Sequence, residues 1–157
     1  MTPPPAQTPA FDIKPLSRDS LSAMAAVHAA SFETPWDAAA LSGYLTPNAV
    51  ALGGYVGGVL SGFILLGPCT DQTDMLTLAV IPQARGMGYG RALVQAAQAR
   101  AAAKGCELIF LEAAEDNSAA LALYKSCGYV PIGTRKNYYK RAGGRISAVT
   151  MRKSLRT

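Results

Sequence analysis

Three glycines at alternate positions, Gly86, Gly88 and Gly90, precede an alanine-rich segment in the stretch "QARGMGYGRALVQAAQARAAAKG". Glycine inside a helix costs about 1 kcal/mol relative to alanine, so three of them at a helix start need a reason. An apolar, strand-like segment, Asp74 to Val80, comes before them and is stopped by Pro82. A strand, a glycine turn and a helix N-terminus together favour anion binding, because the first helical amides lack partners and the helix dipole adds partial positive charge.

Two familiar phosphate-binding motifs do not match this loop. A Walker A loop ends in Gly-Lys-Ser/Thr, whereas Gly90 is followed by Arg91 and Ala92. A dinucleotide fingerprint, G-x-G-x-x-G, needs a glycine where Arg91 stands, although Glu112 mimics its ribose-binding acid at the end of the next strand. A hairpin precedes the loop and little chain follows it, so the repeated βαβ halves of that fold are missing. A merely tight turn would need one glycine, not three.

The rest of the chain predicts a single α/β domain built on a mixed sheet. Its 157 residues are 50% hydrophobic and 16% charged, which is enough apolar material for one buried core. Gly57-Gly58 between two apolar runs predicts a hairpin, and the continuous apolar run "CELIFLEA" predicts a strand covered on both faces. We expect strands at 11–16, 49–56, 59–66, 74–80, 106–113, 129–134 and 146–151, and helices at about 17–30, 34–45, 91–104 and 117–126. This order predicts a central mixed sheet of about seven strands with helices on both faces.

The ends of the chain read differently from its middle. The N-terminus "MTPPPAQTPA" has neither a basic nor an apolar signal region, so residues 1–10 are interpreted as a disordered tail. The domain is expected to span residues 11–153, followed by a basic tail at 154–157. No apolar run reaches the roughly 18 residues of a membrane span, so no membrane partner is expected.

Cysteine and charge content restrict the partners. The three cysteines show no metal-type spacing and the single histidine, His28, has no partner for a metal or nucleophile site. We therefore expect no metal, and buried thiols in a reducing cytoplasm. The net charge is +5, and after Asp116 there is no acidic residue while Lys125 and eight further Lys/Arg follow. Such a basic third suits phosphate groups, an acidic partner or RNA, but without a recognised motif no specific nucleic-acid binding is expected.

The loop pattern Arg85-x-x-Gly88-x-Gly90 matches the R/Q-x-x-G-x-G/A motif of the GNAT superfamily of N-acetyltransferases, whose loop cradles the pyrophosphate of acetyl-CoA. "LTLAVIPQARGMGYGRALV", "FLEAAEDNSAALALYKSCGYVPIG" and "RKNYYK" resemble successive segments of the RimI-type ribosomal-protein-alanine N-acetyltransferases over roughly residues 74 to 151. "SFETPWDAAAL" is similar to the Phe/Pro-Trp segment of that family. The chain departs from it in Tyr89, where an aliphatic residue is usual, and in its Pro-rich N-terminus.

The resemblance implies the GNAT fold and acetyl-CoA as co-substrate, with CoA as product. Backbone groups of one strand would pair with the pantetheine arm, and one amide there would polarise the acetyl carbonyl. The glycine loop would hold the pyrophosphate, with Arg91 adding charge. Asn117 would contact the cofactor, although an asparagine there also suits a helix N-cap. The implied cofactor-binding residues are Leu78, Ala79, Val80, Arg85, Gly86, Met87, Gly88, Tyr89, Gly90, Arg91 and Asn117.

Two residues are implied to act in catalysis. Glu112 matches the family's proton acceptor, acting through water, and an α-ammonium with a pKa of about 8 needs only a modest base. Tyr124 matches the general acid that protonates the departing thiolate. The alternatives are structural: Glu112 could be a strand-end carboxylate in solvent, and Tyr124 a core-facing aromatic.

The acceptor groove is implied to lie between two segments. Asn137, Tyr138 and Tyr139 would form an aromatic patch in a basic loop, with Phe32 and Trp36 opposite; surface aromatics and core contacts are the respective alternatives. The implied reaction is direct attack, in a ternary complex, by the α-amino group of a protein N-terminus, an alanine of a small-subunit ribosomal protein. A lysine or small-molecule amine acceptor is the alternative within the class. A CoA-binding regulatory module without turnover is the alternative outside it, and that module would need neither Glu112 nor Tyr124.

Overall fold

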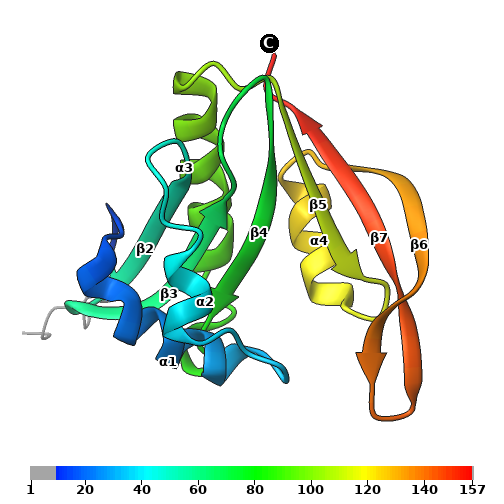
Figure 1. The fold of residues 1–157 in the computed structure, drawn as a ribbon, viewed down its shortest axis with the longest axis horizontal. Coiled ribbons are helices and arrows are strands. Elements are labelled where there is room, and N and C mark those ends of the chain that lie inside the picture. The colour runs from blue at the N-terminus through cyan, green and yellow to red at the C-terminus, as the bar shows by residue number, and fades with distance from the viewer. Residues whose placement is uncertain (1–9, 157) are drawn as a thin grey trace, which may run out of the picture.

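A computed structural model describes residues 10–156 and shows the seven-stranded mixed sheet expected from the sequence (Figure 1). The strand order is β1-β2-β3-β4-β5-β7-β6, with β4 and β5 parallel and all other neighbours antiparallel. The strands are β1 (Phe11–Pro15), β2 (Val50–Val56), β3 (Val59–Leu66), β4 (Gln72–Val80), β5 (Leu108–Ala114), β6 (Val130–Arg141) and β7 (Gly144–Ser154). The helices are α1 (Leu21–Ser31), α2 (Ala38–Ser42), α3 (Tyr89–Ala103) and α4 (Ser118–Ser126), with 3-10 turns η1 (Arg18–Ser20) and η2 (Pro82–Ala84).

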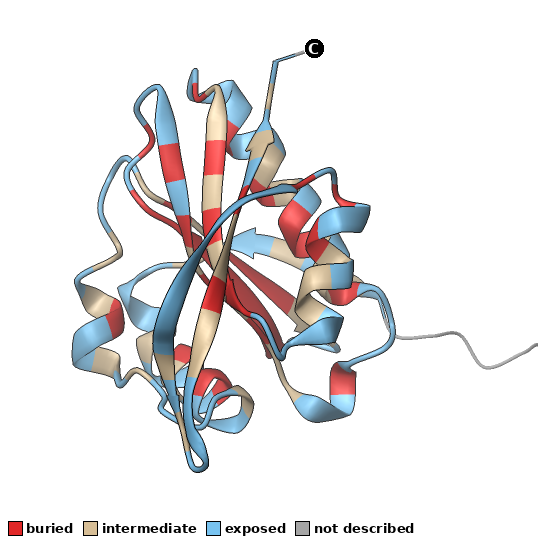
Figure 2. Ribbon diagram, turned by 90° about the vertical axis from the view of Figure 1, so that its right-hand side faces the viewer, coloured by how far each residue is buried: buried red, intermediate tan, exposed pale blue. Residues whose placement is uncertain are grey.

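The two faces of the sheet carry separate hydrophobic clusters. Ile64 of β3 packs with Leu93 of α3, whereas the neighbouring Phe63 packs with Met24 of α1, because successive side chains of a strand point to opposite faces. Helices α3 and α4 therefore cover one face, and α1 and α2 cover the other. Figure 2 shows the buried residues gathered on the central strands and on the inward sides of the helices. Helices on both faces are thus confirmed.

Local signals place several boundaries where the sequence predicts them. Gly57 and Gly58 both have positive φ, at 56° and 81°, and join β2 to β3 in a tight hairpin. The Asp37 side chain accepts a hydrogen bond from the Ala40 amide at 2.8 Å and so caps α2. Helix α3 begins two residues earlier than expected, so Gly90 lies in its first turn.

Strands β4 and β5 pair over only three residues and then diverge. The pairs are Gln72 with Leu108, Thr73 with Ile109 and Asp74 with Phe110. Figure 1 shows the two strands meeting near the C-terminus and spreading apart toward the other end of the molecule. Beyond Asp74, β4 keeps β3 as its neighbour on one side and leaves its other edge facing the gap. We call this gap the splay, and it positions the candidate site.

The β6–β7 hairpin corrects one prediction. The expected strands at 129–134 and 146–151 are the ends of a longer ribbon, in which β6 has 12 residues and β7 has 11. Asn137, Tyr138 and Tyr139 therefore lie on strand β6, and the prediction of a loop there was wrong. Because this ribbon is solvent-exposed along most of β6, its sequence lacks the apolar alternation that marks a half-buried strand. Asn137, with φ of 55°, sits in the irregular stretch between Arg135 and Tyr139.

The burial of β5 corrects a second prediction. Burial alternates along most of the strand: Ile109, Leu111 and Ala113 are buried, Phe110 and Glu112 are half-buried, and the last residue, Ala114, is buried as well. The strand faces helices on one side only, because the opposite face opens onto the splay. At the chain ends, Ser154 is the last residue of β7, and Arg156 forms an ion pair with Glu107 at 2.5 Å. The predicted tail at 1–10 lies almost wholly outside the described residues.

Candidate active site

The glycine loop opens helix α3 with two left-handed residues. Gly86 and Gly88 have φ of 79° and 81°, and a Cβ at either position would meet nothing within 4 Å. These two glycines are therefore required by backbone conformation rather than by crowding. Glycine at position 90 is favoured by crowding instead, since a Cβ there would lie 3.4 Å from the Leu123 side chain of α4. The three alternating glycines thus set the loop's shape and let α3 approach α4.

The loop presents free amides at a helix N-terminus. The first α3 hydrogen bond joins the Ala92 amide to the Gly88 carbonyl at 3.1 Å, so the preceding amides have no helical acceptor. Helix α3 has 15 residues, long enough to carry a full dipole with its positive end at this loop. Met87, between the two left-handed glycines, is 52% exposed. The arrangement suits a phosphate or pyrophosphate, as the sequence predicts.

The two arginines flanking the glycines are bonded to the protein. The Arg85 Nε donates to the Val80 carbonyl at 2.9 Å, at the end of β4. The Arg91 guanidinium donates to the Ser126 hydroxyl at 3.0 Å and to the Ser126 carbonyl at 3.4 Å, so it links α3 to the last residue of α4. Both side chains are exposed and lie beside the loop.

Tyr89 is buried beneath the loop. Its ring stacks on Phe11 of β1, with ring centres 4.1 Å apart, and its hydroxyl has no hydrogen-bond partner among the described residues. The side chain therefore points into the core, and only the backbone amide of Tyr89 remains for a ligand on the loop's outer side.

Leu78, Ala79 and Val80 occupy the β4 edge that faces the splay. Their partners on the other side are residues of β3, where Ala79 pairs with Phe63. The Val80 carbonyl already accepts from Arg85 and, at 3.3 Å, from the Ser31 hydroxyl. The remaining edge offers main-chain donors and acceptors to an extended molecule lying in the splay.

Glu112 lies on β5 across the splay from this edge, with its side chain 22% exposed. Its Oε1 is 2.8 Å from Nε of Arg135 on β6. The Tyr139 hydroxyl donates to the Glu112 backbone carbonyl at 3.3 Å. Burial and the nearby Glu112 carboxylate raise the pKa of Tyr139, so its hydroxyl stays protonated at neutral pH.

Tyr124 of α4 is buried, with 8% of its surface exposed. Burial is the main cause that raises the pKa of Tyr124 well above 10, and the neighbouring Tyr129, 5.9 Å between ring centres, adds to it. The hydroxyl is therefore a stable proton donor across the physiological range. Asn117 caps α4: its side-chain oxygen accepts from the Ala120 amide at 3.1 Å.

Phe32 and Trp36 flank the ring of His28, with centres 4.3 and 5.0 Å from it. Nδ1 of His28 accepts from the Trp36 backbone amide at 3.0 Å, and Nε2 contacts the Thr77 hydroxyl of β4 at 3.1 Å. Phe32 is 39% exposed, so it is both a packing partner of His28 and a surface residue. This aromatic cluster of Phe32, Trp36 and His28 closes one side of the splay.

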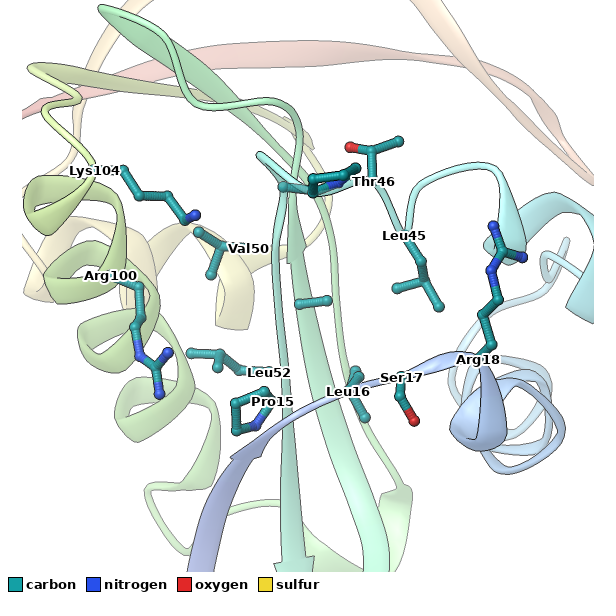
Figure 3. A pocket seen from close by; sticks show the side chains of 13 residues that line it. Pro15, Leu16, Ser17, Arg18, Leu45, Thr46, Val50, Leu52, Arg100 and Lys104 are labelled. Atoms are coloured by element: carbon teal, nitrogen blue, oxygen red, sulfur yellow. The ribbon is translucent and has the colours of Figure 1, made fainter.

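Hollows of similar size lie at separate places among the described residues. One, of about 450 Å³, is lined by Glu33, Asp116 and residues 141–146 of the β6–β7 hairpin, so it adjoins the segments expected to frame an acceptor. The other, of about 440 Å³, lies among Pro15, Leu52 and Arg100 (Figure 3), and neither Glu112 nor Tyr124 lines it. Three cations border it, Arg18, Arg100 and Lys104, and all three are exposed.

The predicted cofactor-binding and catalytic residues lie on β4, β5, α4 and the glycine loop that opens α3, and the structure adds others that the sequence did not single out. Arg135 and Thr77 were missed because their roles depend on which strands lie together. The signal for Arg135 was present in the quoted segment "RKNYYK", where it is the first residue. Among residues 10–156, no group of three or more His, Cys, Asp or Glu could hold a metal, and no helix is long and apolar enough to cross a membrane.

Relatives of known sequence are about one third identical to this chain over the aligned residues. The [ribosomal protein bS18]-alanine N-acetyltransferase of Haemophilus influenzae is 35% identical over 91 residues, which cover 57% of this chain and 62% of the relative. The match thus spans less than two thirds of that relative's length. The N-alpha-acetyltransferase RimI of Mycobacterium tuberculosis is 35% identical over 126 residues, covering 77% of each chain.

Solved structures share the fold. The ribosomal-protein-S18-alanine N-acetyltransferase of Escherichia coli superposes with a TM-score of 0.90 at 24% identity, over 94% of this chain and 96% of that one. The acetyltransferase yncA of Salmonella typhimurium, solved with its cofactor acetyl-CoA, gives 0.81 at 17% identity over 94% and 95%. The model of the acetyltransferase (GNAT) family matches residues 16–129, and the chain therefore belongs to this family.

Proposed function

We propose that this chain is an acetyl-CoA-dependent N-acetyltransferase acting on the N-terminal α-amino group of a protein. The carrying observation is the arrangement of three parts: the free edge of β4, the amides at the start of α3, and Glu112 on β5, the strand on the other side of the splay. Family membership supports the same activity. So do the names of two relatives, one a ribosomal-protein-alanine N-acetyltransferase and the other an N-alpha-acetyltransferase.

The residues present fit acetyl-CoA on two independent observations. The left-handed Gly86 and Gly88 lead into the positive end of α3, where backbone amides without helical acceptors suit a pyrophosphate. The edge of β4 at Leu78 and Ala79 faces no strand, which suits the amide-bearing pantetheine arm. When bound, acetyl-CoA supplies an acetyl group activated as a thioester.

The chain's own groups would then handle the protons. Glu112 accepts a proton from the acceptor ammonium, directly or through water, so that a neutral amine attacks the acetyl carbon. As the C–N bond forms and the C–S bond breaks, the Tyr124 hydroxyl donates its proton to the leaving sulfur, and the attacking nitrogen releases its second proton, which restores the Tyr124 hydroxyl through solvent. The raised pKa of Tyr124 keeps that proton in place until it is needed. The three cysteines are free and buried, so none offers an exposed thiol for a covalent acetyl-enzyme.

The acceptor we propose is an alanine N-terminus of a small-subunit ribosomal protein, in the cytoplasm. The substrate printed in the name of the Haemophilus influenzae relative supports it, and Phe32, Trp36, Tyr138 and Tyr139 are the proposed contacts of the acceptor. A lysine acceptor is the competing proposal. Its ε-amine, with a pKa of about 10.4, would demand a stronger base than an α-amine with a pKa of about 7.7–8.0.

Mass spectrometry of two matched peptides tests the proposal. The first has a free alanine N-terminus and no lysine; the second has a blocked N-terminus and one internal lysine. With acetyl-CoA we expect one acetyl group on the first peptide and none on the second. Acetylation of the lysine alone would overturn the α-amine acceptor, and binding of acetyl-CoA without transfer to either peptide would favour the regulatory module.

A further inference from the structure

The Glu112 carboxylate has one ionic partner among residues 10–156, the guanidinium of Arg135 at 2.8 Å. The two side chains meet across β7. Arg135 pairs with Ala148 of β7, and Ala148 pairs with Ala114, two residues beyond Glu112 on β5. Because directly opposed residues, and residues two apart on one strand, share a face, Arg135 and Glu112 stand on the same side of the sheet.

The strand itself fixes the position of Arg135. It is the last β6 residue in regular pairing before the irregular stretch that contains Asn137 and ends at Tyr139. Its guanidinium lies 5.4 Å from the centre of the Tyr138 ring, within the range of a cation–π contact. The side chain is 61% exposed, against 22% for Glu112, so the arginine approaches the carboxylate from the solvent side.

Glu112 needs such a partner to have a defined direction. A free glutamate side chain samples several rotamers, and ordering it costs conformational entropy. Among the described residues, the other polar contact at this position goes to the backbone, from the Tyr139 hydroxyl to the Glu112 carbonyl. The ion pair is therefore the interaction that orients the carboxylate before an acceptor arrives.

We propose that Arg135 is the positioning residue of the candidate base, holding the Glu112 carboxylate ordered on the β7 side of β5. The inference rests on the proposed function and adds a residue to it. An exposed ion pair contributes little to the free energy of folding, so the proposed contribution of this pair lies in orienting the carboxylate rather than in holding the fold together. The orientation of a catalytic group strongly affects the reaction rate, since a 1 Å misplacement can lower the rate by about 10²-fold.

Steady-state kinetics with acetyl-CoA and an alanine-terminated peptide test it, using R135Q, R135K and the control R152Q. Arg152 is an exposed cation on β7 without an ion pair among the described residues, so R152Q removes the same charge elsewhere. We expect R135Q to lower kcat about tenfold, within the range of a misaimed group, and to leave the KM for acetyl-CoA within about twofold. R135K keeps a cation beside the carboxylate and should recover most of the loss, while R152Q should match the parent.

A double-mutant cycle with E112Q separates positioning from a structural role. If Arg135 acts only through Glu112, E112Q/R135Q is as slow as E112Q alone. A kcat of R135Q equal to that of the parent would overturn the inference. So would a kcat of the double variant that lies below that of E112Q by the full factor seen in R135Q. Neither result would change the assignment of Glu112 as the base. Parental kcat in E112Q would instead remove the base, and absence of transfer by the parent enzyme would remove the proposed function; both would overturn the inference too, each by a distinct result.

Discussion

The backbone amide of Trp36 donates a hydrogen bond to Nδ1 of His28 over 3.0 Å. An accepting Nδ1 carries no proton, so the imidazole is neutral, and its proton sits on Nε2, which donates to the Thr77 hydroxyl. The ring thus ties the segment between α1 and α2 to strand β4, on the side of the splay where Phe32 stands. Protonating His28 would place two N–H groups against each other and break this link.

The pH dependence of stability should therefore report His28. Burial lowers the pKa of His28 below its ordinary 6.5, so the unfolded chain binds this proton at a higher pH than the folded one. Stability is then full above about pH 7 and falls as the pH drops through 6.5 toward the lower folded-state pKa. His28 is the one histidine in the chain. We expect the urea midpoint to fall between pH 7.5 and 5.5, and to change much less in H28N, although H28N is less stable at pH 7.5. Equal pH dependence in both proteins would contradict this.

Replacing Tyr124 by phenylalanine removes the proposed proton donor and keeps the ring. A general acid contributes about 10²–10⁴-fold, so we expect kcat to fall by at least about 100-fold in Y124F with little change in the KM for acetyl-CoA. Because the pKa of Tyr124 is raised above 10, the parent's rate should show no decline from loss of this proton up to pH 9.5. A kcat in Y124F within a few fold of the parent would assign Tyr124 to packing alone.

Gly88 offers a test of the loop with a matched control at the other end of α3. Its φ is 81° and that of Gly105 is 89°, and neither would place a Cβ within 4 Å of another atom. Alanine at either site pays the same conformational cost of about 1–2 kcal/mol. We expect G88A and G105A to lose similar stability, whereas only G88A raises the KM for acetyl-CoA, by about tenfold if roughly 1.4 kcal/mol of binding is lost. Equal KM values for acetyl-CoA in the two variants would show that the conformation of the loop at Gly88 does not affect cofactor binding.

Removing the buried hydroxyl of Tyr89 is expected to stabilise the protein, whereas most substitutions in a core destabilise it. It has no partner among the described residues, and a buried unsatisfied polar group costs about 1–3 kcal/mol. Y89F keeps the stacking on Phe11 and should raise the free energy of unfolding by about 1 kcal/mol. If Tyr89 serves the cofactor through its amide alone, the KM for acetyl-CoA stays unchanged. A raised KM would show that the hydroxyl finds its partner on the ligand.

The sequence predicted the elements whose signals are local. Gly57-Gly58 requires a hairpin, Asp37 and Asn117 cap helices with their own side chains, and the glycine loop marks the start of α3. Each of these depends on the conformation of three or four consecutive residues, which the residue types decide. The order of elements followed, because the strands between them are apolar.

The misses arise where structure depends on distant partners. The β6–β7 ribbon is held by main-chain pairing rather than by burial, so "RKNYYKRAGGR" looked like a loop around Asn137 to Tyr139. The pairing of Arg135 with Glu112 requires that β7 lie between β5 and β6, a strand order that periodicity does not encode. The exposed face of Phe110 and Glu112 likewise follows from the splay and not from the apolar run itself.

The short β4–β5 ladder also has a dynamic consequence. Three residue pairs join the two strands, so most of the seam between them lacks the cooperative hydrogen bonding that protects a continuous sheet. Amide hydrogens along Met75 to Val80 that point into the seam should exchange with solvent faster than those bonded to β3. A molecule filling the seam would slow that exchange from both sides, because it would take the place of a missing strand. Binding of a molecule in the seam between β4 and β5 would thus change the rigidity of this protein more than its shape.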